Sequence, residues 1–156
     1  WFAVGFVKDL PQPGSVKPVN YFKNPLLLIR SIQDKKIRVF QNVCRHRGCA
    51  LLEEAGNSNH IKCGYHGWVY ELNGELRAAR GFDKESLDFQ KFKLKSIEHY
   101  IWMNQIFIKL QSDCNNLPKV LDQIKNIISP KSKAIIFSFR PEKNIISKYY
   151  FAELRK

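Results

Sequence analysis

Long apolar runs are missing from this sequence of 156 residues. No stretch approaches the ~20 consecutive apolar residues of a membrane-spanning helix, and the start shows no signal-peptide pattern. Cysteine is scarce, with four residues in the chain, which does not indicate a disulfide scaffold. Internal repeats and low-complexity tracts are absent as well. We therefore expect a cytoplasmic protein without a membrane partner, folded as one domain or one domain with an appendage.

Acidic residues are too few to balance the basic ones, because 14 Asp and Glu against 26 Lys and Arg give a formal net charge of +12. A charge of this sign can indicate nucleic-acid binding. The lysines are scattered, however, and no recognition-helix, RNA-binding or zinc-finger pattern accompanies them. We interpret the charge as a lysine-rich surface and expect no nucleic-acid partner, with an acidic protein partner as the alternative.

Short runs rich in Val, Ile, Phe and Tyr, separated by turn residues, fill the first two-thirds of the chain and predict a mostly β fold. Asn73-Gly74 is the strongest hairpin signal. The apolar spacing then changes and predicts one amphipathic helix over 116–128, followed by strands in "AIIFSF" and "IISKYYF". The strands expected before the helix are 1–7, 16–21, 26–32, 36–42, 60–63, 68–72, 75–78, 94–102 and 105–110.

Two segments each contain one cysteine followed closely by one histidine. Cys44 and His46 lie in "CRHRG", and Cys63 and His66 lie in "CGYHGW". Thiolate and imidazole together suit zinc, copper and iron–sulfur centres. A structural zinc site usually takes both cysteines from one turn and both histidines from another. The mixed pairs favour a binuclear centre in which each loop gives its Cys to one metal and its His to the other, while structural zinc stays open as the alternative.

Together with "WFAVGFVKDLPQPGSVKPV", "VFQNVCRHRG" and "YHGWVYELNGEL", these segments resemble the Rieske 2Fe-2S domain of aromatic-ring-hydroxylating oxygenase α subunits. The resemblance covers about residues 1–110. It implies a Rieske-type antiparallel β-sandwich with a small cluster-binding subdomain of two loops, plus the C-terminal helix. The expected domains are a Rieske domain over 1–112, with its cluster subdomain at about 43–80, and a helix and strands over 113–156 that lead into an absent catalytic domain.

The resemblance implies that Cys44 and Cys63 hold one iron of a 2Fe-2S cluster, while His46 and His66 hold the other, more exposed iron. Further residues are expected to turn the loops, shield the cluster, stabilise its charge or donate a hydrogen bond to it. These residues are Arg45, Arg47, Gly48, Gly64, Tyr65, Gly67, Trp68 and Tyr70. For each of them a simpler interpretation stays open, as a turn glycine, a core aromatic or an exposed loop charge.

The cytochrome bc type of Rieske protein has a disulfide between its two loops, and this chain departs from that pattern. Cys49 occupies the first disulfide position, but Tyr65 occupies the second, so that disulfide cannot form. Trp68 also stands where the bc type carries a serine that donates to a bridging sulfide. Fewer hydrogen bonds to sulfur favour the oxidised cluster, so we expect a potential near the lower end of the Rieske range, about −150 mV. Cys49 and Cys114 are then expected to be buried free thiols.

Only His60 and His99 remain after the two pairs, and they lie too far apart to suggest a mononuclear iron site, so no catalytic residue is expected. We expect electron transfer from a reductase or ferredoxin to a mononuclear iron in a catalytic domain outside this chain, in a homo-oligomeric Rieske-type dioxygenase or monooxygenase. A stand-alone Rieske ferredoxin-type electron carrier is the alternative, and a zinc-stabilised binding module is a third possibility. The substrate cannot be named from this sequence.

Overall fold

The computed structural model describes residues 1–110, 118, 119, 121, 135–140 and 145–151. The chain forms two compact units, one of Phe2–Leu110 and one that combines Trp1 with Gln111–Lys156. In the second unit, β11 (Ile135–Arg140) pairs antiparallel with β12 (Ile145–Phe151), which confirms the two strands predicted there. The predicted helix over 116–128 lies almost wholly outside the described residues, and Cys114 lies outside them too.

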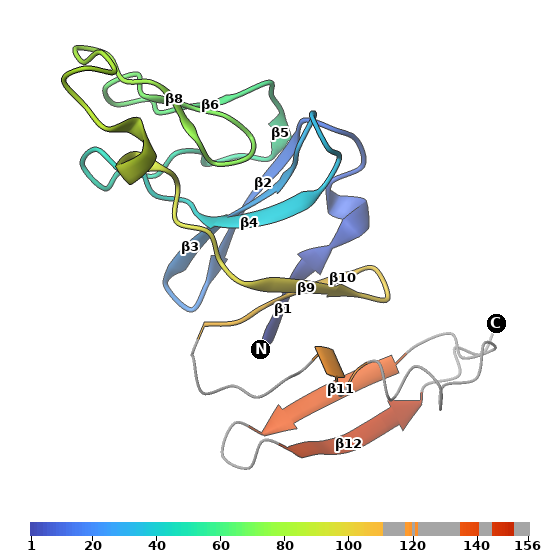
Figure 1. Cartoon of the computed structure of the whole chain (residues 1–156). Helices are drawn as coiled ribbons and strands as arrows, with labels where there is room; N and C mark the ends of the chain where they lie inside the picture. Colours follow the sequence, from blue (N-terminus) through green and yellow to red (C-terminus); the bar gives the residue numbers. More distant parts are fainter. Residues whose placement is uncertain (111–117, 120, 122–134, 141–144, 152–156) are drawn as a thin grey trace. The chain divides into compact units, whose positions relative to one another are not determined.

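Three antiparallel sheets build the larger unit (Figure 1). The first sheet has the order β1-β10-β9, the second β4-β3-β2-β5 and the third β6-β7-β8. Two single 3-10 turns, η1 and η2, follow β1 and β8. In chain order the elements are β1 (Phe2–Phe6), η1 (Val7–Asp9), β2 (Ser15–Tyr21), β3 (Asn24–Arg30), β4 (Ile37–Gln41), β5 (Gly56–Asn57), β6 (Ile61–Lys62), β7 (Val69–Tyr70), β8 (Leu76–Ala78), η2 (Phe89–Phe92), β9 (His99–Trp102) and β10 (Gln105–Ile108).

Strand β3 is buried on both faces. Successive strand residues point to opposite sides, so Leu26 and Leu28 enter one apolar cluster while Leu27 and Ile29 enter another. The first cluster joins β3 and β4 to β1 and β10, and the second joins them to β6, β7 and the loops around these strands. Figure 1 shows the sheet of β2, β3 and β4 between these two regions. The run of four residues 26–29, "LLLI", is therefore continuously apolar instead of alternating.

The hairpin predicted at Asn73-Gly74 is confirmed between β7 and β8. Gly74 has a φ of +92°, and a Cβ there would lie 2.5 Å from the Phe40 ring, so only glycine fits this turn without strain. Two further tight turns carry no glycine. Phe22 and Lys23 have φ of +43° and +63° between β2 and β3. Met103 and Asn104 have φ of +46° and +62° between β9 and β10.

Several predicted strands are shorter in the structure. The strand expected over 94–102 is β9 alone, because the residues before it bond irregularly to other elements: Leu94 N–H donates to Gly74 at 2.8 Å and Ile97 N–H to Val39 at 2.8 Å. The strands expected over 60–63 and 68–72 shrink to the two-residue strands β6 and β7. Cys63 and Trp68, at the facing ends of these expected strands, instead belong to the loop between β6 and β7.

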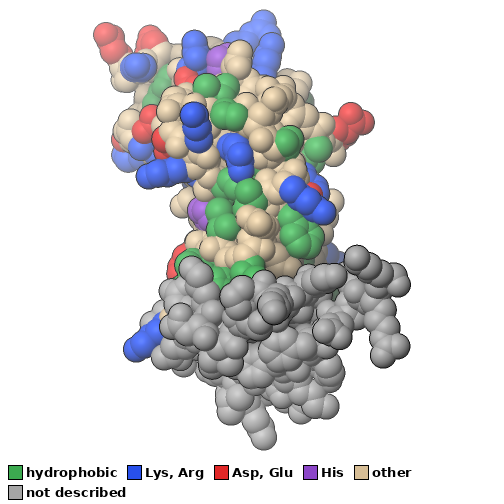
Figure 2. All heavy atoms as spheres, turned by 90° about the vertical axis from the view of Figure 1, so that its right-hand side faces the viewer, with side chains coloured by type: hydrophobic (Ala, Val, Ile, Leu, Met, Phe, Trp, Pro, Cys, Tyr) green, Lys and Arg blue, Asp and Glu red, His purple; other side chains and the backbone are tan. Residues whose placement is uncertain are grey.

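Basic side chains are dispersed over the larger unit. Figure 2 shows Lys and Arg spread over the visible face among other side chains, without one dominant patch. Several form ion pairs, such as Lys17 with Asp9 at 3.0 Å and Lys93 with Glu75 at 3.1 Å. This distribution agrees with the interpretation of a lysine-rich surface. No helix in the described part of the chain is long and apolar enough to cross a membrane.

Candidate metal centre

Two loops of six residues, 44–49 and 63–68, have the same backbone hydrogen bonds, and we call them loop 1 and loop 2. In loop 1 the Cys44 N–H donates to Cys49 O at 2.8 Å, and the Gly48 N–H donates to Cys44 O at 3.0 Å. In loop 2 the Cys63 N–H donates to Trp68 O at 2.8 Å, and the Gly67 N–H donates to Cys63 O at 3.1 Å. Each loop therefore begins at a cysteine and closes on itself five residues later.

Loop 1 is anchored to the central sheet. It follows β4, and an isolated antiparallel bridge between Val43 and Ala50 closes its base. The buried Asn42 side chain holds the chain after the loop, because its Nδ2 donates to Leu52 O at 2.6 Å and its Oδ1 accepts from Leu52 N–H at 3.1 Å. These bonds satisfy both ends of a buried amide and fix the position of the loop.

Loop 2 connects β6 to β7, in which Ile61 pairs with Tyr70 and Lys62 pairs with Val69. Gly67 at its end has a φ of +71°, and Gly48 at the same position of loop 1 has a φ of +78°. Both conformations lie in the left-handed region that favours glycine. Gly64 has no positive φ, and a Cβ there would meet nothing within 4 Å, so the turn itself does not require glycine at this position.

Three thiols meet between the loops. The Sγ atoms of Cys44, Cys49 and Cys63 lie within 4.8 Å of one another, and those of Cys49 and Cys63 are 3.3 Å apart. Cys44 and Cys63 are 2% and 1% exposed, whereas Cys49 is half-buried. Cys49 is therefore a free thiol, as expected, but it is less buried than expected. Its closeness to Cys63 joins two different loops, and no local pattern in the sequence reports it.

The environments of these thiols differ. Burial, and then the neighbouring Cys63, raise the pKa of Cys49 to about 11. Burial opposes ionisation of Cys63, but the backbone N–H groups of Tyr65 and His66 bond to its sulfur, and the net effect lowers the pKa of Cys63. Loop 2 thus favours the thiolate of its cysteine more than an ordinary site does, and the thiolate is the form that binds metal.

The two imidazole rings lie side by side. The centroids of His46 and His66 are 4.6 Å apart, with an interplanar angle of 73°. His46 also stacks on Trp68 at 4.7 Å, and its Nδ1 is buried without a hydrogen-bond partner in the described part of the chain. Partial desolvation, together with repulsion from His46 and Arg47, lowers the pKa of His66. A neutral imidazole with a free nitrogen is the form that can coordinate a metal.

Two aromatic residues of loop 2 have different environments. Trp68 is 1% exposed and packs edge-on against Phe92, with centroids 5.4 Å apart, so it closes the core beneath the histidines. Tyr65 is 65% exposed, and its ring lies 3.8 Å from that of His66. Tyr65 therefore covers one face of His66 but leaves most of its own side chain in solvent, unlike the shielding role expected for it.

Tyr70 contacts loop 1 from strand β7. Its hydroxyl oxygen accepts from the Arg45 N–H at 3.0 Å and lies 3.5 Å from Cys44 Sγ. Because the oxygen already accepts one bond, its own O–H can point at the sulfur. Burial, followed by the bond to Cys44, raises the pKa of Tyr70, so the hydroxyl stays protonated. Of the two arginines in loop 1, Arg47 is exposed, whereas Arg45 is half-buried.

The other two histidines lie apart from these loops. His60 is exposed in a turn before β6. His99 is half-buried, and its Nδ1 and Nε2 face the backbone oxygens of Ile97 at 3.2 Å and Ile37 at 2.9 Å. The ring thereby ties β9 to β4, which is a structural role. Within the described residues, the titratable groups near the loops do not include a second histidine pair.

The donor set fits a cluster with mixed ligands. Two buried thiols lie within 4.8 Å of each other, while two imidazoles lie together and are less buried. A 2Fe-2S centre of the Rieske type uses two thiolates and two imidazoles. A group of this type needs its thiolates shielded and hydrogen-bonded, as Tyr70 and the loop 2 N–H groups provide.

Comparisons with known proteins give the same picture. The family described as Rieske [2Fe-2S] domain matches residues 1–98. The glycine betaine monooxygenase oxygenase subunit of Pseudomonas aeruginosa is 31% identical over 131 residues, which are 83% of this chain and 30% of the relative. The biphenyl dioxygenase subunit alpha of Paraburkholderia xenovorans is 36% identical over 77 residues, 49% of this chain and 17% of the relative.

Solved structures agree with the fold. The quaternary ammonium Rieske monooxygenase CntA, in complex with L-carnitine, matches with a TM-score of 0.69 and 29% identity, over 81% of this chain and 37% of that chain. Naphthalene 1,2-dioxygenase from Rhodococcus sp. matches with a TM-score of 0.71 and 27% identity, over 80% of this chain and 29% of that chain. The chain thus spans between 17% and 37% of the length of these relatives. It belongs to the Rieske [2Fe-2S] domain family, in the form found in the α subunits of Rieske oxygenases.

Proposed function

We propose that Cys44 and Cys63 hold one iron of the 2Fe-2S cluster and that His46 and His66 hold the other. The observation that carries this assignment is the pair of matched loops, which bring their two first cysteines within 4.8 Å of each other and their two imidazole centroids to 4.6 Å. When bound, the cluster supplies reversible one-electron transfer. Structural zinc would require all four donors around one ion, whereas the described geometry separates the thiols and the imidazoles by burial.

The residues around the centre have distinct tasks in this proposal. The Tyr70 hydroxyl and the N–H groups of Tyr65 and His66 stabilise negative charge on the two thiolates. Trp68 excludes water from the buried side. His46 and His66 lie on the less buried side, so electrons enter and leave the centre there.

We further propose that this electron transfer serves an oxygenase whose catalytic domain, with its mononuclear iron, lies outside this chain. The support is that the relatives of this chain are oxygenase subunits. A reductase or ferredoxin would donate the electron, and the whole protein would be a homo-oligomer. For one quaternary ammonium Rieske monooxygenase, the solved structure gives insights into inter-subunit electron transfer. The relatives act on substrates as different as glycine betaine and biphenyl, so the substrate is not selected by this domain.

Metal analysis of the purified chain tests the cluster assignment. The protein should be red-brown and contain about two irons and two acid-labile sulfides per chain. It should also show the electron paramagnetic resonance signal of a reduced cluster with mixed nitrogen and sulfur ligands. A colourless protein with one zinc ion per chain would overturn the proposal in favour of a zinc-stabilised module.

A further inference from the structure

The third thiol of the centre, Cys49, has no task in the cluster assignment, yet its sulfur lies beside that of a proposed ligand. Its Sγ lies 3.3 Å from Cys63 Sγ. The backbone of loop 1 holds it there, because Cys49 O accepts from the Cys44 N–H at 2.8 Å and the neighbouring Ala50 pairs with Val43. A disulfide has an S–S distance of about 2.05 Å, so an approach of about 1.2 Å suffices to form the bond.

We propose that Cys49 and Cys63 are a disulfide site of the cluster-free protein, and that the disulfide blocks cluster insertion until it is reduced. The blocking step rests on the proposed function, because it requires Cys63 to be a cluster ligand. Formation of the disulfide does not rest on the proposed function, because it requires only the two thiols. In the loaded protein the Cys63 sulfur is bound to iron and cannot react, so the site operates only before the cluster is inserted or after it is lost.

Accessibility sets the order of the reaction. Cys49 is half-buried, while Cys44 and Cys63 are buried, so a small disulfide oxidant such as glutathione disulfide reaches Cys49 first. Because the pKa of Cys49 is raised, it reacts through its small ionised fraction: the thiolate attacks the oxidant, breaks its S–S bond, and releases one glutathione, which takes up the proton. The Cys63 sulfur then attacks Cys49 Sγ, forms the internal bond, and releases the second glutathione. The two thiol protons and two electrons of the protein end on the two glutathione molecules.

Cys44, Cys49 and Cys63 allow three disulfide pairings, and the geometry favours Cys49 with Cys63. Cys44 Sγ is engaged with the Tyr70 hydroxyl at 3.5 Å. Cys44 and Cys49 also belong to one loop whose closing hydrogen bond fixes their backbones side by side. Cys49 and Cys63 instead come from different loops, are 14 residues apart in sequence, and have sulfurs 3.3 Å apart. The disulfide therefore forms across the two loops.

Tryptic mapping of the cluster-free chain tests the proposal, because each of the four cysteines falls in its own tryptic peptide: 39–45, 48–62, 63–77 and 110–119. The chain is stripped of iron and sulfide under reductant, then treated with glutathione disulfide. We expect the thiols of Cys49 and Cys63 to disappear and the peptides 48–62 and 63–77 to be joined by a bond that dithiothreitol breaks. Unchanged thiols or stable glutathione adducts at Cys49 and Cys63, or a join of either residue to Cys44 or Cys114, would overturn it.

Cys49→Ser is the matched variant, with circular dichroism to show that it folds as the wild type does and Cys49→Ala to repeat the test. After the oxidant, the wild type should take up no iron and sulfide until dithiothreitol is added, whereas Cys49→Ser should take up both at once. Equal uptake by both proteins would overturn the blocking step. If neither protein takes up a cluster even when reduced, the proposed function fails, while the peptide map still decides whether the disulfide forms.

Discussion

Loop 1 and loop 2 have the same backbone conformation but carry different side chains. The first residue is a cysteine in both loops, and the fifth is a glycine with positive φ in both. The histidine, however, is third in loop 1 and fourth in loop 2. The sixth residue is Cys49 in loop 1 and Trp68 in loop 2. The common backbone thus places the thiols, while the order of the side chains decides which donors and which core groups surround them.

The largest effect is expected from replacing the cysteine with which each loop begins. Cys44→Ser and Cys63→Ser each remove a thiolate, so each variant should lose the visible absorbance and the iron of the cluster. His60→Ala, in an exposed turn, is the control and should keep both. A Cys44→Ser variant with the iron content of the wild type would contradict the equivalence of the two loops.

The glycines test the shared backbone directly. Gly48→Ala and Gly67→Ala force a side chain into a left-handed conformation, so each should lower the free energy of unfolding by about 1–2 kcal/mol. Gly64→Ala should change it by less than about 0.5 kcal/mol, because the position is open and has no positive φ. Urea unfolding of the three variants measures the difference. Equal losses at all three positions would show that the loops do not depend on this conformation.

Tyr70→Phe tests a difference between the loops, because the hydroxyl contacts Cys44, whereas backbone N–H groups contact Cys63. A hydrogen bond to the thiolate stabilises the reduced, more negative cluster more than the oxidised one. Loss of about 1 kcal/mol corresponds to a fall of about 40 mV in a one-electron potential. Redox titration should show this fall for Tyr70→Phe and no change for Tyr65→Phe, since the side chain of Tyr65 is exposed. A rise for Tyr70→Phe would mean that its hydroxyl does not donate to sulfur.

The smallest effect is expected for Arg47 of loop 1, whose charge acts on His66 of loop 2. Arg47 contributes to the lowered pKa of His66, so Arg47→Gln should raise that pKa slightly. With a lowered folded-state pKa, the unfolded chain binds the proton more readily, and the cluster-free chain should lose stability as pH falls through about 6.5. That loss should be shallower in Arg47→Gln. Nuclear magnetic resonance titration of the cluster-free chain measures the pKa, and an unchanged value would exclude the electrostatic contact.

The two loops were predictable from the sequence because their signals are local. Each Cys/His pair spans four residues or fewer, and the Asn73-Gly74 turn beside them carries its own signal. Contacts between segments that are distant in the sequence have no such local signal. Strand β5 has two residues, too few for a pattern, and exists because it pairs with Ser15 and Val16. The approach of Cys49 to Cys63 depends in the same way on how the loops meet.

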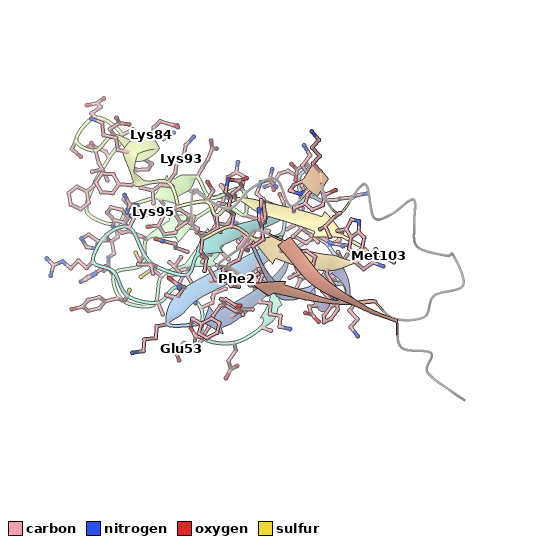
Figure 3. All side chains as sticks on the ribbon, turned by 90° about the horizontal axis from the view of Figure 1, so that it is seen from below. Phe2, Glu53, Lys84, Lys93, Lys95 and Met103 are labelled. Carbon is pink, nitrogen blue, oxygen red and sulfur yellow. The ribbon has the colours of Figure 1, made fainter. Side chains whose placement is uncertain are left out.

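Surface features were harder to predict than the core. The tight turn at Phe22 and Lys23 uses left-handed conformations in residues that rarely adopt them, so sequence preference gave no warning. Figure 3 shows Lys84, Lys93 and Lys95 at the end of the larger unit opposite Met103, an arrangement that spacing in the sequence does not reveal. Which segments are buried was predictable from their composition, because the aromatic and aliphatic runs form the two apolar clusters.

Strand β3 couples these two clusters. Its alternating residues belong to both, so loss of this strand exposes both cores at once. Neither half of Phe2–Leu110 can then persist without the other, and the unit should unfold in one cooperative step with coincident transitions by fluorescence and circular dichroism. The amides of β3 should exchange with solvent deuterium only through global unfolding. The amides of the two loops should exchange through local opening when the cluster is absent. Cluster insertion would then slow exchange in the loops selectively, which makes exchange protection a direct measure of how far the metal rigidifies a preformed scaffold.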